Sequence, residues 1–238
     1  AFIRQSVSSG STINLNDGNI ILFEHVGDTT VSFANTSTAD DVTFIRSLTD
    51  PPDISISTGG VDFDGTGDNL TLASSSDFAY GTGDFTWEMY INPDATPTQF
   101  LLTDNAENEG KLYVHSAGST KVDLTYSSGS VNLNASDGST YLNVDQWHHI
   151  AISRSSGTSR MFVDGVLVDS GSDSKNYGNH DLLIGGRGDG SDHFNGQMSN
   201  LRIVKGRALY TTGFYPPSTA LTNVADTKLL CCQSDSST

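Results

Sequence analysis

An acidic turn carries the clearest metal-ligand pattern in the sequence. Asp62, Asp64 and Asp68 are spaced like the first half of an EF-hand loop, and Gly67 stands where that loop needs a glycine. At the final ligand position, however, Ala73 replaces the bidentate Glu, and no helical pattern flanks the turn. The turn is therefore not an EF-hand. Its aspartates either bind Ca²⁺ in another arrangement or only form Asx-type turns with the nearby backbone.

Glycoside hydrolysis would need a pair of carboxyl groups. Retaining glycosidases hold the two groups roughly 5 Å apart, which alternate residues on one strand face provide. Glu88 stands alone, because Thr86 and Tyr90 occupy the alternate positions beside it. We expect Glu88 to be a solvated or hydrogen-bonded strand residue. No Gly-x-Ser-x-Gly elbow is present either, so the sequence predicts a protein that is not an enzyme.

Two pairs of adjacent residues invite other chemistry. Neighbours on a strand point to opposite faces, so we expect one of His148 and His149 to pack near the core beside Trp147 and the other to face outward. Cys231 and Cys232 are the only cysteines, and adjacent cysteines provide no spaced disulfide framework. We interpret them as small side chains in a terminal strand. A strained vicinal disulfide or a metal site is the alternative.

The elements that must position these residues are strands. Turn signals such as Asp17-Gly18, Asp64-Gly65 and Asp164-Gly165 recur roughly every eight to twelve residues, the spacing typical of all-β folds. No segment sustains helical periodicity over three turns. The strongest strand spans residues 84–91, where apolar residues alternate with Thr, Glu and Tyr until Pro93 ends it.

A hairpin and two further strands complete this prediction. Residues 160–163 and 166–168 flank Asp164-Gly165, which suits the positive φ angles of a type I′ turn. Leu112 and Val114, and likewise Val122, Leu124 and Tyr126, alternate with polar or aromatic neighbours. Each of these segments therefore has one face for a core and one face for solvent.

Charge restricts the class of partner. The 238 residues include 12 Lys and Arg against 28 Asp and Glu, a formal net charge of −16. That balance argues against binding a nucleic-acid backbone, which requires Lys and Arg to displace counterions, and against docking on an anionic membrane. The longest apolar runs, such as residues 20–23, are too short to insert across a bilayer.

The sequence divides into two parts. Residues 1–53 contain short strand candidates at 13–15, 19–24, 30–33 and 42–45, and end in Asp50-Pro51-Pro52-Asp53, a stiff connector. Residues 54–238 have the size of a jelly-roll sandwich. We therefore expect an all-β protein, with an antiparallel jelly roll that follows a small N-terminal β-segment.

Several runs in the second part resemble the concanavalin A-like, laminin G-like jelly rolls. These runs are 61–70, 83–91, 147–151, 161–165 and 194–203. The later runs 204–210, 214–217 and 229–233 are similar to laminin G-like modules of marine bacteriophage virion proteins, such as tail-fibre and head-fibre proteins. The resemblance implies two packed antiparallel sheets whose chain ends lie side by side, with residues 228–233 paired to the strand entering at 54–63.

The resemblance also implies sites. One Ca²⁺ at the sandwich rim would be the cofactor, held by Asp64, Asp68, Asp192 and Asn195. Aromatic faces that stack on sugars would line the rim or concave face; the candidates are Tyr113, Tyr126, Tyr141, Tyr177 and His193.

The function implied is that of a bacteriophage virion structural protein, a head or tail fibre or decoration component. Its jelly roll would bind host-surface glycans, neighbouring virion subunits or further copies of itself, and residues 1–53 would serve as an attachment or contact segment. The alternative is a secreted bacterial carbohydrate-binding or adhesion module. A weaker alternative is a glycoside hydrolase of the same fold. The expected location is the virion surface, or otherwise the extracellular space.

Overall fold

The computed structural model describes residues 59–104, 110–116, 121–135 and 142–233, and the strand backbones within 2–6, 12–15, 20–24 and 32–35. The chain forms two compact units, residues 1–51 and 52–238. No helix in the described part of the chain is long and apolar enough to cross a membrane.

The N-terminal unit contains short parallel pairs. Strand β1 (Phe2–Ser6) pairs with β3 (Ile20–Glu24), and β2 (Thr12–Leu15) pairs with β4 (Ser32–Asn35). The strands expected at 13–15 and 19–24 thus nearly coincide with β2 and β3, whereas the one expected at 30–33 only overlaps β4. The strand expected at 42–45 and the connector at 50–53 lie outside the described residues.

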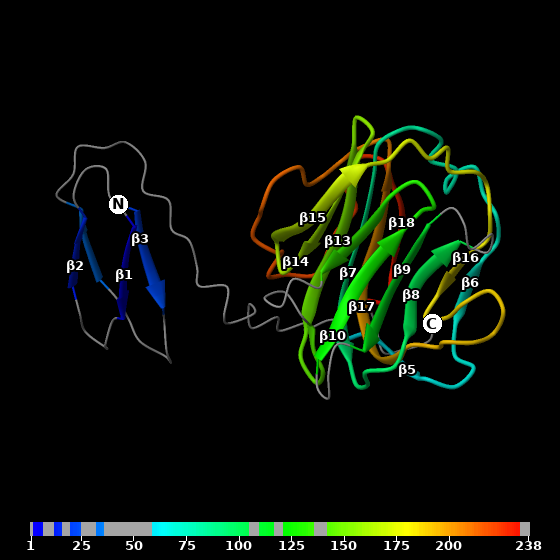
Figure 1. The fold of residues 1–238 in the computed structure, drawn as a ribbon, viewed down its shortest axis with the longest axis horizontal. Coiled ribbons are helices and arrows are strands. Elements are labelled where there is room, and N and C mark those ends of the chain that lie inside the picture. The colour runs from blue at the N-terminus through cyan, green and yellow to red at the C-terminus, as the bar shows by residue number, and fades with distance from the viewer. Residues whose placement is uncertain are drawn as a thin grey trace. The chain divides into compact units, whose positions relative to one another are not determined.

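The second unit is an antiparallel sandwich of two sheets (Figure 1). The first, which we call the β7 sheet, has the order β15 (Val166–Ser172), β14 (Thr158–Val163), β13 (His148–Ser155), β7 (Phe85–Pro93), β17 (Asn195–Lys205), β18 (Thr227–Cys231), with β5 (Val61–Asp64) also paired to β17. The second, the β9 sheet, has the order β11 (Asn132–Ala135), β10 (Lys121–Ser127), β9 (Lys111–Ser116), β8 (Gln99–Asp104), β16 (Leu182–Ile184), β6 (Leu70–Leu72), with β12 (Leu142–Asn143) paired to β10. The all-β jelly-roll prediction is confirmed.

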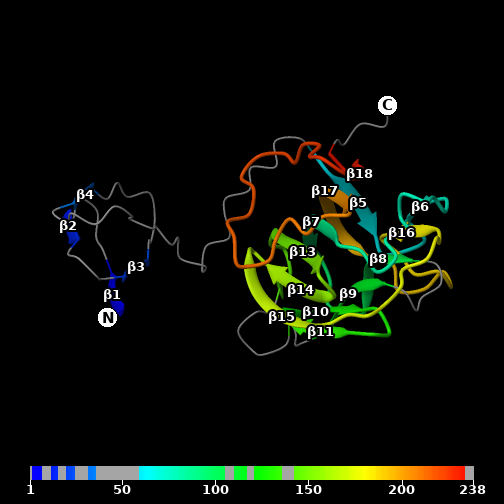
Figure 2. The same ribbon diagram turned by 90° about the horizontal axis from the view of Figure 1, so that it is seen from above.

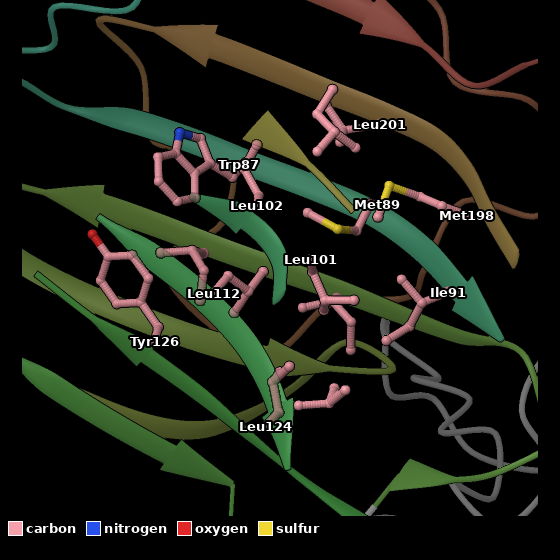
Figure 3. Close-up of a cluster of buried hydrophobic side chains, with 14 of the residues drawn as sticks. Trp87, Met89, Ile91, Leu101, Leu102, Leu112, Leu124, Tyr126, Met198 and Leu201 are labelled. Carbon is pink, nitrogen blue, oxygen red and sulfur yellow. The ribbon is translucent and has the colours of Figure 1, made fainter. Parts of the chain in front are cut away.

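The core lies between the two sheets (Figure 3). Trp87, Met89 and Ile91 alternate along β7 and point toward Leu112 and Leu124 of the β9 sheet, and all five side chains are buried. Because side chains of a strand alternate between its faces, the apolar period of two read from the sequence places these residues on the core side.

The predicted hairpin is present at the edge of the β7 sheet. Val163 pairs with Val166, and Asp164 and Gly165 adopt φ angles of 50° and 78°, as a type I′ turn requires. A Cβ atom at Gly165 would lie 1.9 Å from the Phe214 carbonyl oxygen. Glycine is therefore needed both for the turn and for the close approach of a second segment.

That second segment covers the outer face of the β7 sheet. It comprises residues 206–222, most of the connection between β17 and β18, and we call it the strap; Figure 2 shows it as an orange loop. Leu209 N donates to Thr86 Oγ1 (2.9 Å), and the Tyr90 hydroxyl donates to the Pro217 carbonyl. Residues on both faces of β7 are consequently buried.

The expected pairing of the two chain ends is wrong for the described residues. β18 pairs with residues 201–204 of β17, and β5 pairs with residues 195–198 of the same strand. The two segments thus share β17 as their partner instead of pairing with each other. The long β17 strand offers room for both, one after the other.

Candidate functional site

A row of side chains crosses the outer face of the β9 sheet. Phe100 of β8 is in register with Tyr113 of β9, Tyr113 with Thr125 of β10, and Thr125 with Asn134 of β11. We call these four residues the cross-strand row. In-register residues on neighbouring strands lie close enough for their side chains to touch. The row therefore forms one continuous strip from an aromatic end to an amide end.

The aromatic end of the row is held firmly. The rings of Phe100 and Tyr113 stack with centroids 5.0 Å apart, and the His115 ring lies 5.9 Å from Tyr113. The guanidinium of Arg187 lies 5.5 Å from the centre of the Phe100 ring. Phe100 is itself buried, whereas Tyr113 and His115 are partly exposed.

The polar end of the row is ordered by hydrogen bonds. Thr125 Oγ1 donates to Asn134 Oδ1 (3.0 Å), so the hydroxyl is left to accept from His115 Nε2 (3.2 Å). Asn134 is exposed, and its backbone N–H donates to Asp169 Oδ2 (2.9 Å). An aromatic ring beside an oriented imidazole and an exposed amide can stack on the apolar face of a sugar and bind its hydroxyl groups.

Among the predicted sugar-binding tyrosines that the structure describes, only Tyr113 belongs to this face. Tyr126 and Tyr177 are 0% and 3% exposed, and their hydroxyls hydrogen-bond to each other (2.6 Å) inside the core. Their expected position on the rim or concave face is therefore wrong. Tyr126 is two residues from Leu124 and therefore lies on the same, core-facing side of β10, which the sequence alternation could have indicated. Tyr113 is adjacent to Leu112 and therefore faces the opposite side of its strand. Tyr141 lies outside the described residues.

Sequence reasoning also missed three members of this face. Phe100, His115 and Asn134 were not among the candidates, although His115 and Asn134 follow the alternation of their strands. A register shift between Phe100 and Leu102 conceals Phe100, because it breaks the alternation along β8.

The acidic turn at the rim is organised mainly by its own backbone. Thr66 N donates to Asp64 Oδ1 (2.7 Å), and Asp64 N donates to Asp68 Oδ2 (3.3 Å). Asn195 is in register with Asp64 across β5 and β17. Asp64, Asp68 and Asn195 are thus brought to one edge of the sandwich, where the Asp64 carboxylate forms an Asx-type turn and the Asp68 carboxylate accepts a hydrogen bond from the Asp64 backbone.

Asp192, the remaining predicted calcium ligand, is paired with Arg187. Asp192 Oδ2 lies 3.4 Å from Arg187 Nη1, in an ion pair. His193 bridges the two rim segments, with Nδ1 3.2 Å from the Asp68 carbonyl and Nε2 3.0 Å from the Gly190 carbonyl. No three acidic, His or Cys side chains in the described part of the chain are grouped as a metal site would need. The residues fit a calcium ion only in part, and calcium stays a prediction.

A second polar cluster is buried under the strap around Glu88. Glu88 Oε1 accepts from Arg202 Nε (2.8 Å) and Nη2 (2.6 Å), and Oε2 accepts from the Tyr210 hydroxyl (2.8 Å) and His149 Nε2 (3.2 Å). Burial alone would raise the pKa of Glu88. The hydrogen bond and charge of His149, followed by those of Arg202, outweigh burial and lower the pKa below its ordinary value.

The two histidines are both buried, which corrects the expectation that one faces outward. The strap is the reason, because it covers the face that would otherwise be solvated. His148 Nε2 accepts from Asn143 N (3.2 Å), so His148 Nδ1 carries the proton donated to Asp164 Oδ2 (2.8 Å). His148 thereby holds the hairpin turn, and His149 holds Glu88. Glu88 is hydrogen-bonded, as one of its expected alternatives stated, and is not solvated.

Comparison with known proteins identifies the sandwich. The family model for the concanavalin A-like lectin/glucanases superfamily matches residues 64–211. No curated protein matches the sequence.

The chain is also similar to several solved structures. The chain is similar to a native heptameric SAP-like pentraxin from Limulus polyphemus, with a TM-score of 0.53 and 15% identity over 74% of this chain and 93% of that one. It is also similar to domains LG4-5 of the mouse laminin alpha1 chain (TM-score 0.47, 18% identity, 70% and 47% covered). A third similar structure is domain 4 of an extracellular arabinanase from Geobacillus stearothermophilus in complex with arabinotriose (0.46, 17%, 60% and 69%).

We expect Glu88→Gln to destabilise the protein by about 3–5 kcal/mol at pH 7, because the substitution leaves the Arg202 charge buried without its partner. Urea unfolding measures the difference from wild type. Asp77→Asn is the control: it removes a surface ion pair with Lys228 (3.4 Å), which is worth about 1 kcal/mol or less.

The same measurement has a defined pH dependence. The folded-state pKa of Glu88 lies below its ordinary value of 4.5, so its contribution is fully present above about pH 4.5 and is lost as pH falls through the folded-state pKa. The difference between wild type and Glu88→Gln should therefore shrink on acidification. A difference that is absent at pH 7, or that grows in acid, would contradict this account.

Calcium binding at the rim turn is tested by calorimetric titration of chelator-treated protein. If Asp64 and Asp68 supply ligands, Ca²⁺ produces heat and raises the melting temperature, and Asp68→Asn removes both effects. Asp192→Asn should have the smaller effect, because that carboxylate faces Arg187. Absence of heat and of a thermal shift in the wild-type protein would remove calcium from this turn.

Proposed function

Because the chain belongs to the concanavalin A-like lectin/glucanases superfamily, we propose that its jelly roll is a non-enzymatic domain that binds glycans. The cross-strand row is the observation that carries this proposal. It combines the partly exposed ring of Tyr113 with the exposed amide of Asn134 on the face of the sandwich that the strap does not cover. The ligand would lie across the strands of the β9 sheet.

The chemistry of the row suits a sugar better than a charged polymer. Amphipathic rings such as tyrosine present an apolar face, on which the C–H groups of a sugar ring can stack, together with a polar tip. Hydroxyl groups of the sugar would meet the Asn134 amide, which offers both donors and an acceptor. The chain's net charge of −16 disfavours polyanionic ligands.

The buried state of Glu88 supports the non-enzymatic part of the proposal. A glycosidase needs two carboxyl groups beside the scissile bond. Glu88 is enclosed by Arg202, Tyr210 and His149 under the strap, so its carboxylate cannot reach a sugar outside the protein. We therefore favour the binding module over the hydrolase alternative.

We further propose that a bacteriophage virion displays this domain as a fibre or decoration component, attached through residues 1–53. The support is the sequence resemblance of residues 204–210, 214–217 and 229–233, which form the end of β17, much of the strap, and the end of β18 together with Cys232 and Gln233. Neighbouring virion subunits, further copies of the chain and host-surface glycans would be its partners. The alternative is a secreted bacterial carbohydrate-binding or adhesion module, which would use the same row.

Glycan-array binding tests the domain's function. We expect the full chain to bind, and Tyr113→Ala to weaken binding roughly fivefold, because loss of a stacking aromatic costs about 1 kcal/mol. Tyr113→Phe keeps the ring and should retain most of the affinity. Tyr215→Ala is the matched control, since Tyr215 is 60% exposed on the strap, away from the row. Unchanged binding by Tyr113→Ala would contradict the assigned face, and release of reducing sugar would contradict the non-enzymatic proposal.

Immuno-electron microscopy tests the location. Antibodies against this chain should decorate purified virus particles at regular positions. A protein that is absent from particles and is secreted by a bacterium would reject the virion proposal in favour of the secreted module. The glycan-binding proposal would be unaffected by that result, because the two experiments use separate readouts.

A further inference from the structure

The two cysteines of the chain meet where β18 ends. Cys231 is the last residue of β18 and is partly buried, and Cys232 follows it with 7% exposure against the core. Their sulfur atoms lie 3.6 Å apart. These two residues account for every thiol in the chain.

The backbone brings the two sulfur atoms together. Successive side chains of a regular strand point to opposite faces, which would separate adjacent thiols. Cys232 instead adopts a left-handed conformation, with φ of 58°, an unusual state for a residue other than glycine. Its carbonyl accepts a hydrogen bond from Asn200 N (2.8 Å), and Asn200 is also left-handed, with φ of 52°. The reversal at this pair of residues is thus fixed by the fold.

The contact also differentiates the two thiols. Either sulfur can donate in this contact; when the Cys232 thiol donates to the Cys231 sulfur, the hydrogen bond lowers the pKa of Cys231 and raises the pKa of Cys232. The thiolate is the nucleophilic form of cysteine. Cys231, the more accessible residue of the two, is therefore also the one better prepared to attack.

We propose that Cys231 and Cys232 form a redox-active pair that a small-molecule disulfide such as glutathione disulfide oxidises to a disulfide between neighbouring residues. The Cys231 thiolate attacks one sulfur of the oxidant, forms a mixed disulfide and releases one glutathione thiolate. The deprotonated sulfur of Cys232 then attacks Cys231 Sγ, forms the intramolecular S–S bond and releases the second glutathione thiolate. The pair loses two protons and two electrons, and the oxidant is reduced to two thiols.

A disulfide between neighbours would be easy to reduce. Consecutive Cα atoms of a trans peptide are about 3.8 Å apart, whereas disulfide-linked Cα atoms are usually about 4.4–6.8 Å apart. The resulting strain makes such a bond more reducible than an ordinary structural disulfide. The pair is therefore suited to reversible oxidation.

The turn that holds the thiols also anchors the strap. Gln233 Nε2 donates to Asn200 Oδ1 (2.7 Å) and to the Leu221 carbonyl (2.7 Å), and Leu221 N donates to Asn200 Oδ1 (2.8 Å). Oxidation would change the backbone between Cys231 and Gln233. Its structural effect should consequently appear first at the C-terminal end of the strap.

Equilibration of the full chain in glutathione buffers of increasing oxidising ratio tests the proposal, with acid quenching, alkylation and mass spectrometry as the readout. We expect molecules with two alkylated thiols to convert directly into monomers with none and with two fewer hydrogen atoms. Persistent glutathione adducts, disulfide-linked dimers, or two free thiols even in the most oxidising buffer would each overturn the proposal.

Single substitutions supply the control. Cys232→Ser removes the resolving thiol, so Cys231 should accumulate as a stable glutathione adduct. Cys231→Ser should react more slowly, because the remaining thiol is buried. Equal reaction of the two variants would contradict the assignment of Cys231 as the attacking thiol. The wild-type measurement does not depend on whether either variant folds.

Discussion

The buried Glu88 carboxylate is the charge that the architecture of the β7 sheet must accommodate. An ionised carboxyl group in a protein interior is tolerated only when charges and hydrogen bonds replace its lost hydration. Arg202, Tyr210 and His149 together do so, and they come from β17, the strap and β13. The cluster therefore links β7 and β13 to β17 and to the strap that follows it in the sequence. If the strap left the sheet, Glu88 would lose the hydrogen bond from Tyr210, and its ion pair with Arg202 would become exposed to solvent.

This constraint decides which surface is open to a ligand. With the strap in place, the outer face of β7 contributes no accessible side chain from Thr86, Glu88 or Tyr90. The outer face of the β9 sheet keeps the partly exposed Tyr113 and the exposed Asn134. At the rim, Arg187 joins the two candidate regions, since it lies against Phe100 and also pairs with Asp192. A displacement of Asp192 would thus be transmitted to Phe100, at the aromatic end of the row, through the Arg187 side chain.

Local patterns predicted the regular parts of the fold. The alternation along β7 and the Asp164-Gly165 turn depend on neighbouring residues alone, and both were read correctly. The strap was not predicted because it has no periodic pattern. Its effect on His148 and His149 was therefore missed, since a strand's sequence does not report whether a second layer covers its polar face. Likewise, the approach of Cys232 to Cys231 depends on Asn200 in another strand, and the residues next to the two cysteines contain no pattern that predicts this contact.

The direction of the cross-strand row has a consequence for ligand length. The row runs perpendicular to the strands, and the part of it between the accessible Tyr113 and Asn134 spans two strand-to-strand steps of about 4.8 Å each, about 10 Å in all. That reach exceeds a single sugar ring. A ligand lying along it would contact the protein through at least two consecutive sugar units, so the repeating unit of a polymer, and not its terminal sugar, would determine selectivity. Such a surface would recognise an extended polysaccharide at many equivalent positions, and bound molecules could shift along it by whole repeats.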